Sequence, residues 1–415
     1  MTFINRLVVS LVALLPFTSN AIAQDALTLD QKVNETFAAF TGPFVSFIFA
    51  PLPGTSFPWI VMWLVVAATV FTLYFGFVQF RYFLHSISLV KGDYSDPDDA
   101  GEVSHFQALA TALSGTVGLG NIAGVAVAVG IGGPGATFWM ILAGLLGMAS
   151  KFTECTLGVK YRNEYDDGTV SGGPMYYMSK GFKELGLPGG KILAVLFSIF
   201  CILGALGGGN MFQVNQAFQL VENLTGGESS FLNGYGWLFG LVMAILVGIV
   251  IIGGIKSIAK VTDKIVPFMV VIYVAASIFV LVAKYDMIAD AFAQIFNGAF
   301  SPEGVLGGAV GVLVQGFRRA AFSNEAGIGS ASIAHSAVKT KYAASEGMVA
   351  LLEPFIDTVV VCTMTALVLI ITGNVVAENA TLNDAQAILL TSGAFESVIS
   401  WFPYVLTVSV ILFAF

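Results

Sequence analysis

Long runs of hydrophobic residues, separated by short polar segments, repeat along most of the chain. After residue 56 they fall at residues 57–80, 105–132, 136–159, 192–220, 235–255, 265–283, 305–337, 348–372 and 395–415. Each run is near the ~20 residues with which an α-helix crosses a bilayer. The pattern predicts an all-α polytopic membrane protein with nine transmembrane segments. An amphipathic stretch at residues 33–50 is expected to lie along the outer surface.

Two of these runs carry glycine and polar residues halfway along their length. Residues 114–121 read SGTVGLGN, and residues 322–329 read FSNEAGIG. Non-helical backbone at membrane depth is tolerated only where protein buries it or where it lines a cavity, and transporters use such breaks to bind substrates and ions. We therefore expect a transport site at the two breaks.

The N-terminus and the basic residues predict the orientation. Residues 1–23 contain one basic residue, a short apolar run and a small-residue cleavage site, which predicts a secretory signal peptide followed by a periplasmic segment at residues 24–56. Twelve of the 18 Lys and Arg fall in alternate loops, and the positive-inside rule places those loops in the cytoplasm. Both signals predict a multi-pass protein of the bacterial inner membrane with its mature N-terminus outside.

The two broken runs start five spans apart and cross in opposite directions. They would open two inverted five-helix repeats with discontinuous first and sixth core helices, at residues 104–284 and 304–415. One extra transmembrane helix, at residues 57–80, would precede them. The second repeat is shorter than the first and the chain stops inside an apolar run, so we expect the second repeat to be incomplete and the chain to be truncated at its C-terminus.

Composition narrows the classes of function. The chain is 56% hydrophobic and 11% charged, whereas a soluble domain is about 25% charged. A net charge of −8, with no basic patch, argues against a nucleic-acid partner. Membrane lipid is the expected surrounding, and no obligatory protein partner is evident. HExxH, GxSxG and phosphate-loop motifs are absent, so we do not expect an enzyme. The three cysteines lie in apolar runs and are expected to pack there.

Four separated motifs resemble those of the sodium:alanine (alanine or glycine:cation) symporter family. Residues 132–140 read GGPGATFWM, residues 171–177 read SGGPMYY, residues 209–216 read GNMFQVNQ and residues 322–327 read FSNEAG. The resemblance runs from about residue 57 to the C-terminus, with Ile141 where the family often has Trp. It implies the leucine-transporter fold and sodium-coupled import of alanine, glycine or a similar small neutral amino acid. Sodium would be the coupling ion, with no other cofactor.

An amino acid has a carboxylate and an ammonium group, and a helix broken at mid-membrane can bind both. We expect the N–H groups of Leu119, Gly120 and Asn121 to face the carboxylate at the positive end of a half-helix. Carbonyl groups of Thr116 and of residues 322–324 would bind the ammonium group. Glycine at Gly118 and Gly120 allows the backbone to approach the ligand closely.

The second break supplies Phe322, the candidate wall that limits side-chain size, followed by Ser323 and Asn324. Asn210 and Gln213, on the third core helix, could face the same site or could equally form hydrogen bonds between helices.

Sodium is a hard cation that prefers oxygen ligands, and our candidates are the carbonyl groups of Ser114 and Val117. The resemblance implies further hydroxyl ligands on the eighth core helix, beyond Phe415.

Charged residues inside the spans are rare and normally paired, so we expect structural ion pairs there. The candidates are Arg318, Arg319, Glu325, Glu353 and Asp357.

In the alternative reading, Glu154, Glu325 or Glu353 carries a proton, which would make the protein a proton-coupled amino-acid transporter or exchanger. His85, His105 and His335 lie near cytoplasmic span ends, where we expect solvated loop or interface positions rather than catalysis or metal binding.

Overall fold

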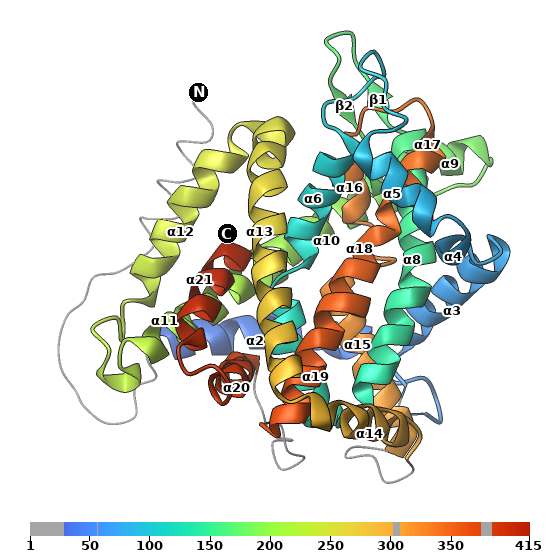
Figure 1. Cartoon of the computed structure of the whole chain (residues 1–415). Coiled ribbons are helices and arrows are strands. Elements are labelled where there is room, and N and C mark those ends of the chain that lie inside the picture. The colour runs from blue at the N-terminus through green and yellow to red at the C-terminus, as the bar shows by residue number, and fades with distance from the viewer. Residues whose placement is uncertain (1–28, 56, 302–307, 375–383) are drawn as a thin grey trace. The chain divides into compact units, whose positions relative to one another are not determined.

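The computed structural model describes residues 29–55, 57–301, 308–374 and 384–415 (Figure 1). The predicted signal peptide, residues 1–23, lies outside the described residues. The described residues divide into two units between Ala50 and Pro51. In the first, helix α2 (Leu29–Ile48) contains all but the last two residues of the predicted amphipathic stretch. Its side chains Phe37, Phe40, Phe44 and Phe47 recur at near-helical spacing and are exposed.

Among the residues that the structure describes, the regular elements of the second unit are helices, one short hairpin and two isolated β-bridges, Pro51–Pro58 and Val103–Val338. Up to that hairpin its elements are α3 (Trp59–Tyr74), α4 (Val78–Arg81), α5 (Phe83–Lys91), α6 (His105–Thr116), η1 (Gly120–Gly124), α7 (Val125–Gly132) and α8 (Ala136–Lys160). The antiparallel strands β1 (Asn163–Glu164) and β2 (Val170–Ser171) follow, and they pair Asn163 with Ser171.

After the hairpin come α9 (Pro174–Glu184), α10 (Gly190–Gly204), η2 (Ala205–Phe212), α11 (Gln213–Leu224), η3 (Gly227–Ser229), α12 (Gly236–Ile251), α13 (Gly254–Ala283), η4 (Tyr285–Met287) and α14 (Ile288–Phe300). The C-terminal part contains α15 (Gly308–Asn324), α16 (Ala331–His335), α17 (Ala343–Ala350), α18 (Leu352–Pro354), η5 (Phe355–Cys362), α19 (Thr363–Thr372), α20 (Asp384–Glu396) and α21 (Phe402–Ala414). Elements η1, η2 and η5 are π-helical, and η3 and η4 are 3₁₀ turns.

Several helices are long and apolar enough to cross a membrane. Within the described residues they are Ala136–Lys160, Gly190–Leu224, Gly254–Ala283 and Ala343–Thr372, and the bent pair α6 and η1–α7 makes a fifth if it is counted as one span. Helices α3, α12 and α21 are shorter apolar helices. The chain is thus an all-α polytopic membrane protein, although fewer helices meet these criteria than the nine apolar runs suggested.

The last predicted span differs from the observed one. Residues 395–415 do not form one helix, because α20 ends at Glu396 and α21 begins at Phe402. Pro403 stands in the first turn of α21, where its missing N–H costs no helical hydrogen bond. A proline in that position favours a new helix start over continuation of the old one.

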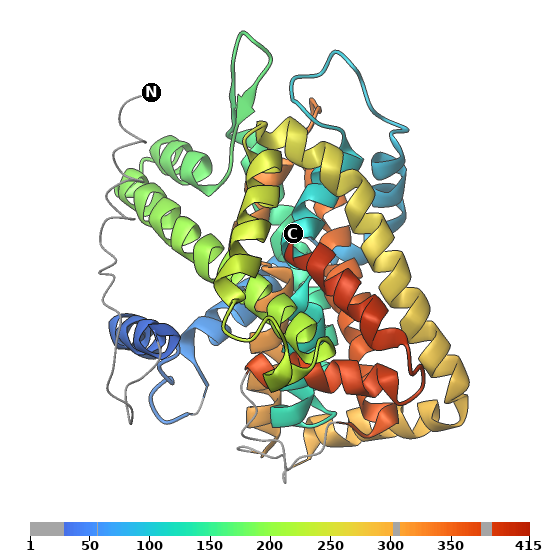
Figure 2. The same ribbon diagram turned by 90° about the vertical axis from the view of Figure 1, so that its left-hand side faces the viewer.

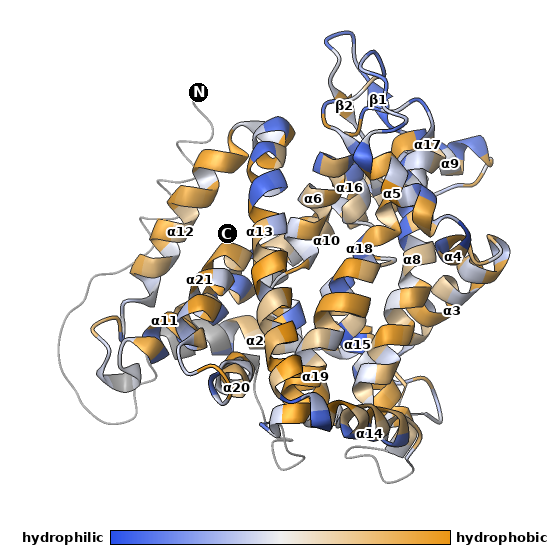
Figure 3. Cartoon of the chain, viewed as in Figure 1, coloured by the Kyte–Doolittle hydropathy of each residue, from blue (hydrophilic) through white to orange (hydrophobic). Residues whose placement is uncertain are grey.

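Helix α8 runs through the centre of a group of helices. It packs against α3, α15, α16 and α17, and α6 packs against both α13 and α16. On another side of this unit, α21 packs against α11 and α13 (Figure 2). Hydrophilic residues gather at the end of the unit that carries β1 and β2, including the first turns of α13, while α12, α19 and α21 are largely hydrophobic (Figure 3).

Candidate functional site

The first predicted break is present, and it is short. Helix α6 starts with a capping box formed by Ser104 and Gln107 and ends at Thr116, and its continuation is bent by 55°. Val117 has an extended backbone, with φ −74° and ψ 101°. Residues 117–124 are all buried. The non-helical part is therefore residues 117 and 118, and it begins two residues after Gly115, the first glycine of the motif that suggested it.

The second break lies between α15 and α16. Glu325, Gly327 and Gly329 all have positive φ, at 53°, 85° and 97°. A Cβ atom on Gly329 would lie 2.8 Å from Pro174 Cγ, so glycine is required there by both backbone and space. The positive φ of Glu325 is unusual for a residue with a side chain. Phe322, Ser323 and Asn324 form the last turn of α15 rather than the break itself.

Asn121 joins the two breaks. Its Oδ1 accepts a hydrogen bond from the Gly118 N–H at 2.7 Å, which closes the first break on itself. Its Nδ2 lies 3.0 Å from Ser323 Oγ, at the end of α15. The same nitrogen lies 2.6 Å from Asp357 Oδ1, 3.0 Å from the Asp357 carbonyl oxygen and 3.3 Å from Cys362 Sγ. Since an amide nitrogen carries only two hydrogens, these four acceptors compete for it.

Asp357 lies at the centre of this cluster and is completely buried. Its Oδ2 accepts hydrogen bonds from Ser323 Oγ at 2.8 Å and from Thr358 Oγ1 at 2.7 Å. Among the described residues, no lysine, arginine or histidine forms an ion pair with it. Asp357 is thus a buried carboxylate that neutral donors from both broken helices surround. The sequence reading assigned it only to an ion pair.

Three π-helical segments carry residues of this region. Asn121 lies in η1, Asn210 and Phe212 lie in η2, and Asp357 lies in η5. A π-helical turn contains an extra residue relative to an α-helix, and such turns occur frequently at functional sites. Hydrophobic periodicity gave no sign of these turns, because each lies within a long apolar run.

Backbone N–H groups at the first break already have partners inside the protein. Leu119 N–H donates to Gln213 Oε1 at 3.2 Å, and Asn121 N–H donates to the Gly118 carbonyl oxygen. A Cβ atom on Gly120 would lie 3.3 Å from Ser323 Cα. Gly120 therefore packs against the end of α15, next to the second break, and Gln213 faces the first break from α11. Of the two readings left open for Gln213, the structure thus gives it both a contact with the break and a link between helices.

Asn324 and Phe322 lie on either side of Ser323 and have different surroundings. Asn324 is buried; its Nδ2 donates to Thr358 Oγ1 at 2.8 Å and its Oδ1 accepts from Ala326 N–H. Phe322 is 40% exposed, and its ring meets the edge of Phe212 with ring centroids 5.5 Å apart. Phe322 therefore stands at the edge of the cluster, with an aromatic neighbour from η2.

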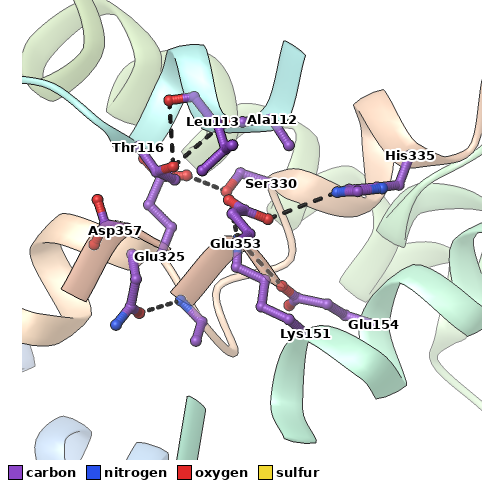
Figure 4. Close-up of polar contacts among 12 residues, drawn as sticks. Ala112, Leu113, Thr116, Lys151, Glu154, Glu325, Ser330, His335, Glu353 and Asp357 are labelled. Carbon is purple, nitrogen blue, oxygen red and sulfur yellow. Dashed lines mark hydrogen bonds and ion pairs between the residues drawn. The ribbon is translucent and has the colours of Figure 1, made fainter. Parts of the chain in front are cut away.

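Other predicted site residues have partners away from Asp357. Thr116 Oγ1 bonds to the carbonyl oxygens of its own helix (Figure 4), and Asn210 Nδ2 bonds to the Ala205 carbonyl oxygen while remaining exposed. Val117 is fully buried. Ser114 lines a cavity between α6, α12, α13 and α21 whose lining does not include Asp357. The structure does not test the predicted sodium contacts of Ser114 and Val117.

The acids predicted to pair with Arg318 and Arg319 have other partners in the structure. Glu353 accepts from Lys151 Nζ at 2.9 Å, with both side chains fully buried, and Glu154 lies 3.7 Å from the same nitrogen (Figure 4). Glu325 accepts a hydrogen bond from Ser330. Lys151 is a buried cation that sequence reasoning missed, although Glu154 three residues later on the same helix was a signal of it. Arg318 is exposed and Arg319 partly buried.

The prediction for two of the histidines was wrong. His105 is 3% exposed and His335 is fully buried, and the Nδ1 atoms of both lie 2.5 Å from the carboxylate oxygens of Glu346. His335 Nε2 lies 3.7 Å from Glu353 Oε2 (Figure 4). His105 is the first residue of the apolar run 105–132, and His335 lies two residues before the end of the run 305–337. Both side chains lie inside the protein rather than in water. His85 is partly exposed and packs against the Tyr94 ring.

The sequence of this chain also matches a known protein family. The family model described as "Sodium:alanine symporter family" matches residues 44–415. The chain belongs to the sodium:alanine symporter family. The motifs at residues 132–140, 171–177, 209–216 and 322–327 all fall inside the matched region.

Known proteins with different names are similar to this chain in sequence. It is 40% identical over 359 residues to the sodium/alanine symporter AgcS of Methanococcus maripaludis, covering 86% of this chain and 77% of that protein. It is 34% identical to the amino-acid carrier protein AlsT of Bacillus subtilis, over 83% of this chain and 70% of AlsT. It is 32% identical to the "Probable sodium/glutamine symporter GlnT" of the same organism, over 83% of this chain and 68% of GlnT. These names indicate transport rather than catalysis, and they name more than one amino acid.

Proposed function

We propose that this protein imports a small neutral amino acid, alanine or glycine, together with sodium by alternating access. The observation that carries the proposal is Asp357, a buried carboxylate to which the two broken helices both donate hydrogen bonds, through Asn121 and Ser323. Membership of the sodium:alanine symporter family supports the pairing of sodium with an amino acid.

Sodium is a chemically suitable ion for the Asp357 cluster. Removing a carboxylate from water costs several kcal/mol, and neutral hydrogen-bond donors offset only part of that cost. Sodium prefers hard oxygen ligands, and both carboxylate oxygens and the carbonyl oxygen of Asp357 lie in the cluster with the hydroxyl of Ser323. In this proposal sodium binds these oxygens, and Thr358 and Asn121 hold the carboxylate in position. The carbonyl groups of Ser114 and Val117 stay predictions as further sodium ligands.

The amino acid would bind beside this cluster, at the first break. Its carboxylate would bind the N–H groups of Leu119 and Gly120, at the positive end of a half-helix. Because Gln213 Oε1 accepts the Leu119 N–H, the amide of Gln213 would have to turn away or bind the substrate itself. The ammonium group would bind the carbonyl groups of Thr116 and of the last turn of α15. Phe322 and its neighbour Phe212 would limit the length of the side chain.

The arrangement in the membrane is part of the proposal. The bent pair of α6 and α7 and the break between α15 and α16 support inverted repeats at residues 104–284 and 304–415, with an extra helix at residues 57–80. Helix α13 carries Lys256 and Lys260 in its first turns. Figure 3 shows that these turns are hydrophilic and lie at the end that carries β1 and β2. By the positive-inside rule, this end would face the cytoplasm of an inner-membrane protein.

A proton is the second candidate for the coupling ion. Of the acids first considered for this role, Glu353 lies 2.9 Å from the buried ammonium group of Lys151, which favours its ionised form. Glu154 lies 3.7 Å from the same group, and Glu325 accepts a hydrogen bond from Ser330. Asp357 has no cationic partner among the described residues, so it suits a proton as well as sodium. Sodium and a proton are therefore alternative coupling ions for the same carboxylate.

Uptake by purified protein in liposomes separates these functions. Labelled alanine is supplied with an inward sodium gradient at equal pH on both sides, and potassium replaces sodium in the control. We expect accumulation only with the sodium gradient, and excess unlabelled glycine should reduce it. Equal uptake with potassium would exclude sodium coupling, and uptake that follows an imposed pH gradient without sodium would establish the proton alternative.

A further inference from the structure

Helix α14 has three different faces around its axis. The helix follows η4 and lies across the end of the unit opposite to β1 and β2, crosswise to α8 and α13 (Figure 1). Successive residues of an α-helix are rotated by about 100° around the axis. With that spacing the buried side chains of α14 fall on one face; they are Ala291, Ile295 and Ala299.

The exposed residues of α14 divide into an aromatic face and a polar face. The aromatic face has a phenylalanine at every fourth position; these are Phe292, Phe296 and Phe300, which are 40%, 54% and 58% exposed. The polar face follows it around the helix, and its exposed residues are Asp290, Gln294 and Asn297. One exposed side of the helix therefore suits hydrocarbon and the other suits water.

Aromatic residues from neighbouring elements extend the aromatic face. The Phe138 ring, in the first turn of α8, lies 5.7 Å from the Phe296 ring and 5.1 Å from the Phe300 ring, measured between centroids. Tyr285, in η4 between the end of α13 and the start of α14, is exposed. Helices α8 and α13 are both long and apolar enough to cross a membrane. Aromatic side chains thus gather where α8 begins and α13 ends, as they do in the aromatic belts at membrane–water interfaces.

The motif at residues 132–140, GGPGATFWM, fixes α14 to the start of α8. A Cβ atom on Gly135 would lie 2.2 Å from the Gly298 carbonyl carbon, so the two backbones touch at a pair of glycines. Trp139 Nε1 donates to the Ala299 carbonyl oxygen at 3.0 Å. That carbonyl group is among the last four of α14, which have no partner within the helix. Trp139 therefore caps the C-terminal end of α14.

The same motif packs against α15, the helix that ends at the second break. A Cβ atom on Gly316 would lie 2.6 Å from the Ala136 carbonyl oxygen. The Trp139 and Phe317 rings lie 6.3 Å apart between centroids. The motif thus lies between α14 and α15, and none of these contacts involves the residues around Asp357.

Phospholipid is the partner that suits the two exposed faces together. The aromatic face continues onto Phe138 at the start of α8, and so onto the surface that a membrane-spanning helix presents to lipid. The polar face beside it suits the water and headgroups above the acyl chains, which is the arrangement of helices that lie in a membrane interface. Helix α14 contains no lysine or arginine, so its attachment would depend on apolar burial and not on anionic headgroups.

We propose that α14 is an interfacial helix that lies in the plane of the membrane surface on the side opposite to β1 and β2. Its Phe292, Phe296 and Phe300 side chains contact phospholipid at the boundary between headgroups and acyl chains. Gly135 and Trp139 are the positioning residues that set the rotation of the helix. The proposal goes beyond the proposed transport function and does not depend on the substrate or the coupling ion.

Spin labels on the two exposed faces of α14 test the proposal. Ala289→Cys and Ala293→Cys place labels on the aromatic face, and Asp290→Cys and Asn297→Cys place them on the polar face; all four residues are exposed. The whole chain also carries Cys201→Ser, because the other two native cysteines are buried. In phosphatidylcholine vesicles, power saturation measures the access of each label to oxygen, which concentrates in the bilayer, and to a water-soluble nickel chelate.

We expect the ratio of oxygen access to nickel access to be at least about fivefold higher at the two alanine positions than at the two polar positions. Four equal ratios would overturn the proposal, because α14 would then stand wholly in water or wholly among acyl chains. Poor access of both reagents to the alanine positions would also overturn it, because another protein surface, such as a second copy of this chain, would then cover the aromatic face.

Gly135→Ala tests the role of the motif. The φ angle of Gly135 is −61°, so alanine suits the backbone and the added Cβ atom acts through its contact with α14. We expect the difference in ratio between the Ala289→Cys and Asp290→Cys labels to fall at least about twofold in Gly135→Ala. It should be unchanged in Gly248→Ala, where a Cβ atom meets nothing within 4 Å. Trp139→Phe, which keeps an aromatic ring and removes the N–H, gives the same test if Gly135→Ala does not fold. An undiminished difference would remove the motif from the positioning of α14.

Discussion

The side-chain amide of Asn121 lies 2.6 Å from the carboxylate of Asp357, 236 residues later in the chain. Through this contact, the first helix break binds the π-helical turn of η5. Ser323 completes the cluster from the end of α15, with its hydroxyl group on the other carboxylate oxygen. A substitution of any one of the three residues should therefore alter the structure at both breaks.

Substitution of Gly120 should weaken alanine binding in proportion to side-chain size. A Cβ atom at this position would lie 3.3 Å from Ser323 Cα, in the backbone of the opposite break, which cannot easily move. We expect Gly120→Ala to lower alanine affinity several-fold and Gly120→Leu to abolish binding while leaving membrane insertion intact. Gly124→Ala is the matched control, because a Cβ atom there meets nothing within 4 Å. Alanine affinity like that of the unsubstituted protein in Gly120→Leu would show that the site lies elsewhere.

Loss of Lys151 should destabilise the protein through the charges it leaves behind. Lys151→Met removes the only ammonium group bonded to the buried carboxylate of Glu353 within the described residues. Removing one partner of a buried ion pair costs about 3–5 kcal/mol in the free energy of unfolding. Lys151→Met combined with Glu353→Gln should recover part of that loss. Thermal unfolding in detergent checks both variants, with exposed Lys191→Met as the control; equal melting temperatures for Lys151→Met and the control would contradict the assignment.

Phe322 should limit the size of the transported amino acid. Its ring packs edge-on against Phe212 beside the Asp357 cluster, so truncation would open space there. We expect Phe322→Ala to reduce the preference for alanine over glutamine about tenfold, measured as the ratio of their inhibition constants against labelled alanine uptake. Phe106→Ala is the control, since Phe106 is equally exposed at 41% but lies on α6 away from this contact. An unchanged ratio would remove Phe322 from the pocket wall.

The sequence predicted those features that depend on local pattern. Glycine and polar residues within apolar runs located both breaks, and the family motifs predicted the symporter family, which the family model confirms. The exact ends of the breaks were missed because Ser114 to Thr116 and Phe322 to Asn324 are the last turns of α6 and α15 and not part of the breaks.

Features that depend on partners far apart in the chain could not be predicted in this way. Glu346 binds His105, 241 residues earlier, and Glu353 binds Lys151, 202 residues earlier. Both histidines looked like residues at the ends of spans, and the acids looked like partners for the nearest arginines in sequence. The packing of α17 against α6, and of α18 against α8, brings these partners together. The same holds for Asp357, which has no cationic partner among the described residues although Arg318 and Arg319 were its candidate partners.

Sodium binding by the purified protein tests the central claim most directly. Radioactive sodium binding is titrated in the protein as it stands, in Asp357→Asn and in Asp286→Asn, whose carboxylate is exposed. We predict saturable binding that alanine strengthens, at least about tenfold weaker in Asp357→Asn, which corresponds to ~1.4 kcal/mol or more, and unchanged in Asp286→Asn. Asp357→Asn binding sodium as tightly as the unsubstituted protein would contradict the assignment of this carboxylate to the coupling ion.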